Sequence, residues 1–263
     1  MAYLFFRLIA KYILGRREPL RAVVWGGPIW VFVVFLAVFM ATLLKGLKNL
    51  HLDLSLGQAL TVSIVASLLA AGLSTVLIRR AVRLNSHVPP DEQLGCVEKI
   101  FVPLVIITSC SVAFSHGAND VANAAGPLAA VVEIVRTSQV PQQVQIDLWI
   151  LFLGGMGIAT GLVLLGYRVI ETVGMNITDL TPSRGVAADI ATTVCVLTFS
   201  RLGVPISTTH TLVGAVIGVG LARGITGINL RVINSIFLSW IGTIPFTAAL
   251  TITFYWLLVL FTG

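Results

Sequence analysis

Long apolar runs separated by short polar stretches are the main pattern along the chain. A helix that crosses a bilayer needs about 20 mostly apolar residues. Four runs reach this length without interruption, at 23–44, 58–78, 148–170 and 232–261. The last run is long enough to tilt, and Pro245 predicts a kink within it. The polar stretch 81–99 predicts an aqueous loop.

Two further apolar segments are interrupted by polar residues. The segment 100–135 is interrupted at 115–120, which reads SHGAND, and the segment 185–222 is interrupted at 203–210, which reads GVPISTTH. Non-helical backbone at membrane depth is tolerated only where it is buried in protein or lines a cavity. The pattern therefore predicts an all-α, polytopic membrane protein with two broken or re-entrant helical segments.

The same pattern divides the chain into parts. Residues 1–22 form an N-terminal cytoplasmic or interfacial segment, in which 3–14 is an interfacial helix or the tail of an apolar helix from a longer chain. Residues 23–99 hold two transmembrane helices and a cytoplasmic loop. Residues 100–263 carry both interrupted segments and form the part in which we expect the function to lie.

Composition supports the membrane assignment and excludes several other classes. Hydrophobic residues make up 57% of the chain and charged residues only 11%, against about 25% charged in a soluble domain. The net charge is +6, but the basic residues lie between apolar runs and so act as topology anchors, which argues against nucleic-acid binding. The three cysteines have no metal-ligand spacing, so a zinc site or a disulfide framework is not expected.

The distribution of lysine and arginine predicts the orientation. Basic residues are frequent before the first span and after the second, whereas the loop between these spans has two lysines. The first group is Arg7, Lys11, Arg16, Arg17 and Arg21, and the second is Arg79, Arg80, Arg83 and Lys99. The loop between the spans holds Lys45 and Lys48. The positive-inside rule places the N-terminus and the loop 79–99 in the cytoplasm. So compact a chain suggests a bacterial inner membrane. The topology after residue 100 stays open, because a broken segment can cross or turn back.

The first interruption offers ligands for a cation. Asp120 and Asn123 are three residues apart and share a helical face. A lone carboxylate in the membrane is expensive, and a bound cation both neutralises it and attracts an anion. Oxygens of Asp120, Asn123 and freed carbonyls would suit Na⁺. The alternative is that Asp120 caps a helix while Asn119 closes a turn.

The second interruption offers donors for an anion. A helix that starts inside the membrane presents free N–H groups and the positive end of its dipole, an arrangement that binds anions. Ser207, Thr208 and Thr209 add three hydroxyls there, which either donate to an anion such as phosphate or serve in capping and helix packing. Asp189 is acidic within an apolar helix, so it is either a functional candidate or an interfacial residue.

Two histidines accompany the interruptions. His116 and His210 invite a metal or proton-relay interpretation, but their spacing matches no metal motif. We expect both to form structural hydrogen bonds.

At these positions the sequence resembles a known family. Residues 116–128, HGANDVANAAGPL, and 205–214, PISTTHTLVG, are similar to the two signatures of the inorganic phosphate transporter (PiT) family. The resemblance runs from about residue 20 to the C-terminus. It implies Na⁺- or H⁺-coupled secondary transport of phosphate, with no enzymatic activity and no cofactor beyond the coupling ion.

The resemblance also implies residue roles. Asp120 and Asn123 would coordinate the coupling cation, Na⁺ in the simplest case. Ser207, Thr208 and Thr209, with amides near Gly117, Ala118 and Asn119, would hold the anion. Asp189 falls where the family usually has a glutamate, and we include it among the residues for the coupling ion.

The chain departs from the family in one large feature. The family consists of two inverted repeats that each carry both signatures, whereas this chain has one copy of each, and Gly126-Pro127-Leu128 resembles the C-terminal repeat. The expectation is therefore one half of an inverted-repeat transporter, acting as a homodimer or with a chain that carries the other repeat.

Other functions stay open. A sulfate permease of the same fold is one, although only phosphate carries protons that an acceptor such as Asp189 could recognise. A non-transporting subunit that needs a partner chain is another. An intramembrane hydrolase using Asp120 with His116 or His210 is the third, and no nucleophile–base spacing supports it.

Overall fold

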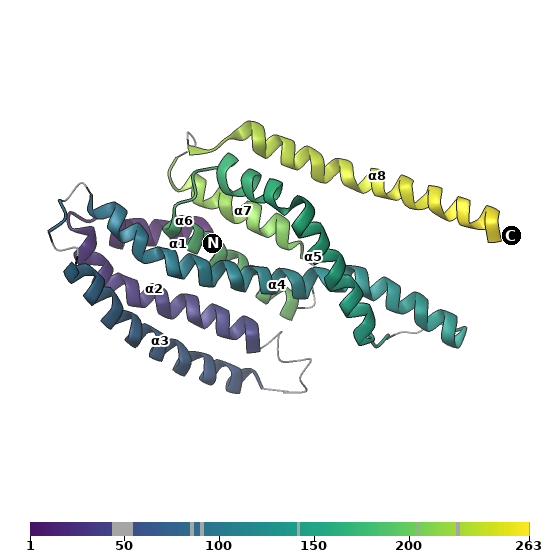
Figure 1. Cartoon of the computed structure of the whole chain (residues 1–263), viewed down its shortest axis with the longest axis horizontal. Coiled ribbons are helices and arrows are strands. Elements are labelled where there is room, and N and C mark those ends of the chain that lie inside the picture. Colours follow the sequence, from purple (N-terminus) through teal and green to yellow (C-terminus); the bar gives the residue numbers. More distant parts are fainter. Residues whose placement is uncertain are drawn as a thin grey trace.

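Helices are the only regular secondary structure in the part that the computed structural model describes, which comprises residues 1–43, 55–84, 87–89, 92–140, 143–202, 204, 206–224 and 227–262. This confirms the all-α prediction. In chain order the elements are α1 (Ala2–Ile9), the π-helical turn η1 (Ala10–Leu14), α2 (Pro19–Ala41), α3 (Leu56–Leu84), α4 (Gln93–Thr137), α5 (Leu148–Glu171), the π-helical turn η4 (Thr172–Asn176), α6 (Pro182–Arg201), α7 (Thr208–Leu221) and α8 (Leu230–Thr262). Figure 1 shows the longest helices running along the long axis of an elongated molecule.

Five helices among the described residues are long and apolar enough to cross a membrane: α2, α3, α4, α5 together with η4, and α8. The runs 58–78, 148–170 and 232–261 each lie within one of them, as predicted, and the run 23–44 lies in α2 up to its end at Ala41. The helix α8 continues through Pro245. Its 33 residues span about 50 Å, more than the roughly 30 Å of a bilayer core.

The predicted break at 115–120 is wrong. The helix α4 runs without interruption through this stretch for 45 residues. No proline lies between 115 and 120, so every backbone N–H there can donate within the helix. The polar side chains are satisfied by one another and by α7 instead. Consequently the amides of Gly117, Ala118 and Asn119 lie inside a helix rather than at a freed end.

The second break is present. The helix α6 ends at Arg201 and α7 begins at Thr208, while Gly203 and Pro205 lie outside the described residues. With 14 residues, α7 is about 21 Å long and too short to cross the bilayer. The two helices pack against each other, so they form a helical hairpin.

The ends of α3 and α4 correct the predicted loop. We expected an aqueous loop over 81–99, but α3 continues to Leu84 and α4 begins at Gln93. Helices extend past their apolar runs because each turn satisfies its own backbone groups at the membrane surface. Lys45 and Lys48, used above for the orientation, lie outside the described residues.

The N-terminal segment is helical, as predicted, and has one buried face. Ala2, Phe6, Ile9 and Ile13 are all buried, at a spacing that places them on one side of a helix. The helix α1 packs against α6 and α7, whereas η1, with Ile13, packs against α2.

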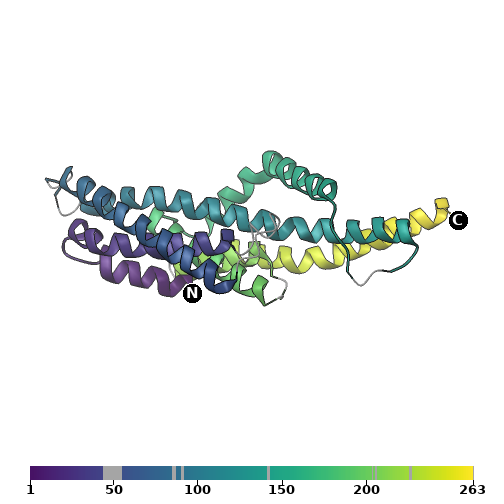
Figure 2. The ribbon, with the colours of Figure 1, turned by 90° about the horizontal axis from the view of Figure 1, so that it is seen from below.

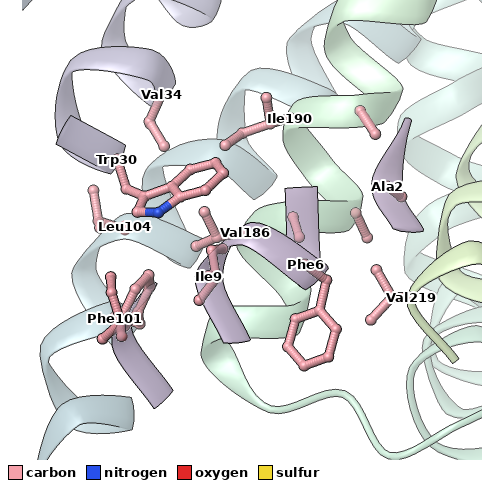
Figure 3. Packing of buried hydrophobic residues seen from close by; sticks show 14 of the residues in the cluster. Ala2, Phe6, Ile9, Trp30, Val34, Phe101, Leu104, Val186, Ile190 and Val219 are labelled. Carbon is pink, nitrogen blue, oxygen red and sulfur yellow. The ribbon is translucent and has the colours of Figure 1, made fainter. Parts of the chain in front are cut away.

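The core lies where α1, α2, α4, α6 and α7 meet. Figure 3 shows Trp30, Phe101 and Val186 from three of these helices facing one another. Alanines on α6, including Ala187 and Ala191, are buried there, and small side chains allow helices to approach closely. The most apolar window of α8 is not buried at all, and Figure 2 shows the C-terminal part of α8 extending to the far end of the molecule. The core thus positions α4, α6 and α7, which carry all the predicted site residues except Ser207, the residue directly before α7.

Candidate functional site

Asp120 of α4 meets the N-terminus of α7. The hydroxyl of Thr208 lies 3.0 Å from Asp120 Oδ2 and 3.2 Å from Oδ1, and donates to this carboxylate. Asn119 Nδ2 donates to Asp120 Oδ1 at 3.0 Å and to the Ile206 carbonyl at 3.1 Å. Residues 87 and 88 positions apart in the sequence are therefore held together by side-chain hydrogen bonds.

His116 completes this cluster from one turn earlier on α4. Its Nδ1 lies 2.6 Å from Thr208 Oγ1 and 2.9 Å from Asp120 Oδ2. Since an ionised carboxylate only accepts, the contact with Asp120 requires a hydrogen on Nδ1. His116 thus forms structural hydrogen bonds, as predicted, although its partners are side chains.

Asp120 is accessible as well as hydrogen-bonded. Its side chain is 28% exposed and that of His116 is 41% exposed, so an ion can reach the carboxylate. The positive end of the α7 dipole lies beside it and favours negative charge. The junction of α4 and α7 thus combines a reachable carboxylate with an electropositive helix end.

Ser207 caps α7. Its Oγ accepts from the His210 backbone N–H at 3.3 Å and lies 2.6 Å from His210 Nδ1. The His210 ring stacks on Trp240 of α8 with centroids 3.7 Å apart. Among the described residues, the backbone N–H groups of Thr208 and Thr209 have no acceptor, and Thr209 is exposed. The first turn of α7 therefore offers two N–H donors without an acceptor among the described residues, one on the buried Thr208 and one on the exposed Thr209.

The other candidate residues on α4 form no side-chain hydrogen bond with the cluster of Asp120, His116 and Thr208 in the described structure. Asn123 is exposed, and its side chain makes no hydrogen bond to any described residue. Gly117 is partly buried, and an added Cβ there would meet open space. Ala118 belongs to the same helical turn. Asn123 shares the helix with Asp120, but no contact in the described structure joins them.

Asp189 lies in a separate place. It is buried on α6, and both Thr108 Oγ1 at 2.8 Å and Ser109 Oγ at 2.7 Å donate to its Oδ2. These partners precede Asp120 by at least 11 residues of α4, which is about 17 Å along the helix. The structure therefore forms two carboxylate sites along α4.

Thr108 and Ser109 were missed in the sequence. The signal was available, because three hydroxyl residues, Thr108, Ser109 and Ser111, interrupt an otherwise apolar run at 100–114. The contact between His116 and Asp120 follows from their separation of four residues once α4 is known to be continuous.

Thr208→Val is expected to lower the free energy of unfolding by about 1 kcal/mol, because the carboxylate of Asp120 loses an interhelical donor without loss of volume. Thr208→Ser retains the hydroxyl and should lose less than half as much. Chemical unfolding in mixed micelles measures both. A larger loss for Thr208→Ser than for Thr208→Val would show that the methyl group, not the hydroxyl, makes the contribution.

Comparison with known proteins is consistent with this architecture. A "Putative phosphate permease" from Haemophilus influenzae is 42% identical over 259 residues, which cover 98% of this chain and 61% of the relative. "Inorganic phosphate transporter 2-1, chloroplastic" from Arabidopsis thaliana is 34% identical over 277 residues and matches 98% of this chain and 47% of the relative. A solved structure titled "The sodium-dependent phosphate transporter" superimposes with a TM-score of 0.78 at 39% identity, over 98% of this chain and 62% of that one. The chain thus spans about three fifths of the length of the bacterial relative.

A family match along nearly the whole sequence shows to which family the chain belongs. The model of the phosphate transporter family, a family of transporters rather than enzymes, matches residues 1–251. This range includes both signatures, the site at the junction of α4 and α7 and four of the five apolar helices in full. The chain is accordingly a multi-pass membrane protein that belongs to the phosphate transporter family.

Proposed function

We propose that the chain binds inorganic phosphate and Na⁺ at the junction of α4 and α7 and takes part in Na⁺-coupled phosphate transport. The observation that carries this proposal is the reachable carboxylate of Asp120 beside the free N–H groups of α7. The solved relative is a sodium-dependent phosphate transporter, which supports the proposal.

Each candidate residue has a role in this proposal. Asp120 binds Na⁺, with the side-chain oxygen of Asn123 as a further ligand after a rotamer change. The hydroxyls of Ser207 and Thr209, with the first N–H groups of α7, hold phosphate. Thr208 and Asn119 orient the carboxylate. Because the amides of Gly117 and Ala118 lie inside α4, these residues do not supply donors to the anion in this proposal.

Coupling follows from charge. An anion beside the free carboxylate of Asp120 is repelled, and a Na⁺ ion on that carboxylate removes the repulsion. Linkage requires that phosphate strengthens Na⁺ binding by the same factor. Ser207 is exposed directly before α7, so the anion reaches it without passing through the core.

Asp189 is proposed as a second site for the coupling ion, either Na⁺ or H⁺. A buried carboxylate whose donors are two hydroxyls has no positive partner among the described residues, and a bound cation would neutralise it.

Asp189→Asn should preserve the fold, since an amide still bonds to hydroxyls, but should lower the Hill coefficient for Na⁺ or remove the pH dependence of phosphate binding. The measurement is phosphate binding against Na⁺ concentration at several pH values. Glu133→Gln, the same charge change at a partly buried position near the end of α4, is the control. Unchanged Na⁺ and pH dependence in Asp189→Asn would assign Asp189 a structural role.

The orientation is proposed from the positions of the basic residues. In Figure 1 the turn between η1 and α2, the end of α3 and the start of α4 lie at the left end, and α4 and α8 end at the right. Arginines at the left end include Arg16, Arg17 and Arg80, whereas Arg136 near the right end is paired with Asp147 at 3.2 Å. We place the left end in the cytoplasm of a bacterial cell. The test is to place a single cysteine at position 16 or at position 139 and to add an impermeant maleimide from outside the cell. We expect the cysteine at 139 to react first, and faster reaction at position 16 would contradict this orientation.

The site is proposed to act in a homodimer or with a chain that carries the other repeat, because this chain spans about three fifths of its bacterial relative. A non-transporting subunit is the competing interpretation.

Phosphate uptake by proteoliposomes that contain only this chain tests the function. Uptake driven by a Na⁺ gradient, absent with a K⁺ gradient and unaffected by excess sulfate, is the expected result for a homodimer. Uptake only after addition of a second chain would require the other repeat. Uptake of sulfate at the same rate would contradict phosphate specificity, and folded protein that neither binds nor moves phosphate would contradict the proposal.

A further inference from the structure

A basic hollow lies away from the proposed transport site, between η1 and the start of α2. It has a volume of about 1050 Å³, and its charged lining consists of Arg16, Arg17, Glu18 and Arg21. Glu18 pairs with Arg21 at 3.0 Å. Arg16 and Arg17 have no acidic partner among the described residues. The hollow therefore carries excess positive charge that the protein does not neutralise.

The wall of this hollow on α2 changes from charged to apolar in a fixed order. Arg21, Trp25 and Ile29 follow one another at steps of four residues and line the hollow together, so they lie on one face of the helix about 6 Å apart. Trp25 is 74% exposed and Ile29 is 63% exposed. An exposed stripe of this kind at the entrance of a membrane span lies against lipid.

The opposite wall adds an aromatic ring and more positive charge. Tyr12 of η1 lines the hollow, with the Arg16 guanidinium 6.0 Å and the Lys11 ammonium 5.5 Å from its ring centroid. A tyrosine between cations is suited to the level of the lipid head groups, where its ring is apolar and its hydroxyl is wet.

We propose that this hollow binds one anionic phospholipid from the leaflet at this end of the molecule. The phosphate of the head group would lie among Arg16, Arg17 and Arg21, the glycerol region beside Trp25, and an acyl chain along Ile29. The order of side chains on α2 matches the order of chemical groups in the lipid. A free phosphate ion would use the arginines alone and leave Trp25 and Ile29 without a role, so the lipid is the better occupant.

The test uses Trp25 as the reporter in vesicles of phosphatidylcholine that contain either brominated phosphatidylglycerol or brominated phosphatidylcholine. Bromine quenches a tryptophan that it contacts, and the difference between wild type and Trp25→Phe isolates Trp25. We expect the affinity measured from quenching of Trp25 to be roughly tenfold higher for brominated phosphatidylglycerol than for brominated phosphatidylcholine, because a basic cluster attracts anionic lipid.

Two variants separate a site from general attraction. R16Q/R17Q/R21Q should remove the preference, and R16Q/R17Q should weaken it if the triple variant does not fold. The control R79Q/R80Q/R83Q makes the same charge change on exposed positions of α3 and should retain the preference.

Three results would overturn the proposal. The first is equal quenching by the two brominated lipids in the wild type. The second is an equal loss of the preference for phosphatidylglycerol in R16Q/R17Q/R21Q and in R79Q/R80Q/R83Q. The third is full displacement of brominated phosphatidylglycerol by inorganic phosphate. The last result would identify a site for small anions. None of these measurements depends on transport, so the proposed function can fail without affecting this inference.

Discussion

Replacement of Asp120 by asparagine is expected to abolish the effect of Na⁺ on phosphate binding. In the wild type Na⁺ should strengthen phosphate binding, because it neutralises the carboxylate beside the anion. Asparagine retains the hydrogen bond from Thr208 but carries no charge, so the site loses its attraction for Na⁺. Loss of a charged partner of this kind typically weakens binding by roughly 100-fold or more, which should appear in the apparent affinity for Na⁺ measured by radiolabelled phosphate binding.

The control for this variant is Glu133→Gln, an equivalent change on the same helix outside the cluster. It should bind phosphate with wild-type dependence on Na⁺. If both variants lost the dependence equally, the general charge of α4 would be responsible. If Asp120→Asn retained the dependence, Asp120 would be excluded as the Na⁺ ligand.

Phe101→Ala is expected to destabilise the fold by about 3–5 kcal/mol, the usual range for truncation of a buried phenylalanine. Phe101 of α4 is fully buried and packs among Trp30, Leu104 and Val186 (Figure 3). Inside the membrane the loss comes mainly from packing contacts, because lipid tails are as apolar as the side chain. The measurement is chemical unfolding in mixed micelles.

The matched control is Phe254→Ala on α8. Phe254 is 58% exposed, so lipid or detergent tails fill the space that its ring leaves. A loss below about 1 kcal/mol is expected there. Equal destabilisation by the two variants would mean that α8 packs against protein as tightly as the core does.

Much of the fold could be predicted because apolar length is a strong signal. The runs now seen as α2, α3, α5 and α8 contain almost no charge over the length of a bilayer. The break before α7 was also predictable, since Pro205 follows Gly203 within it and proline cannot continue a helix.

The break expected in α4 shows where sequence reasoning failed. Asn119 and Asp120 are poor helix formers because their side chains compete for nearby backbone groups. In the folded chain these side chains bond instead to Ile206 and Thr208, which lie more than 80 positions further on. Local propensity cannot register partners at that distance, so it favoured a break that tertiary contacts remove.

The separation of the two carboxylates could not be predicted either. Asp120 and Asp189 were grouped as residues for one coupling ion, yet the partners of Asp189 are Thr108 and Ser109. The register between α4 and α6 decides this pairing. It depends on how the small residues of α6 pack, and the spacing of polar residues carries no information about it.

The binding of both ions at the junction of α4 and α7 is tested by a structure of this chain determined with Na⁺ and phosphate. We expect phosphate at the N-terminus of α7, with oxygens about 2.7–3.2 Å from Ser207 Oγ and from the first N–H groups of the helix, and Na⁺ on the carboxylate of Asp120. Phosphate bound elsewhere, or at α7 with no cation on Asp120 at saturating Na⁺, would contradict it.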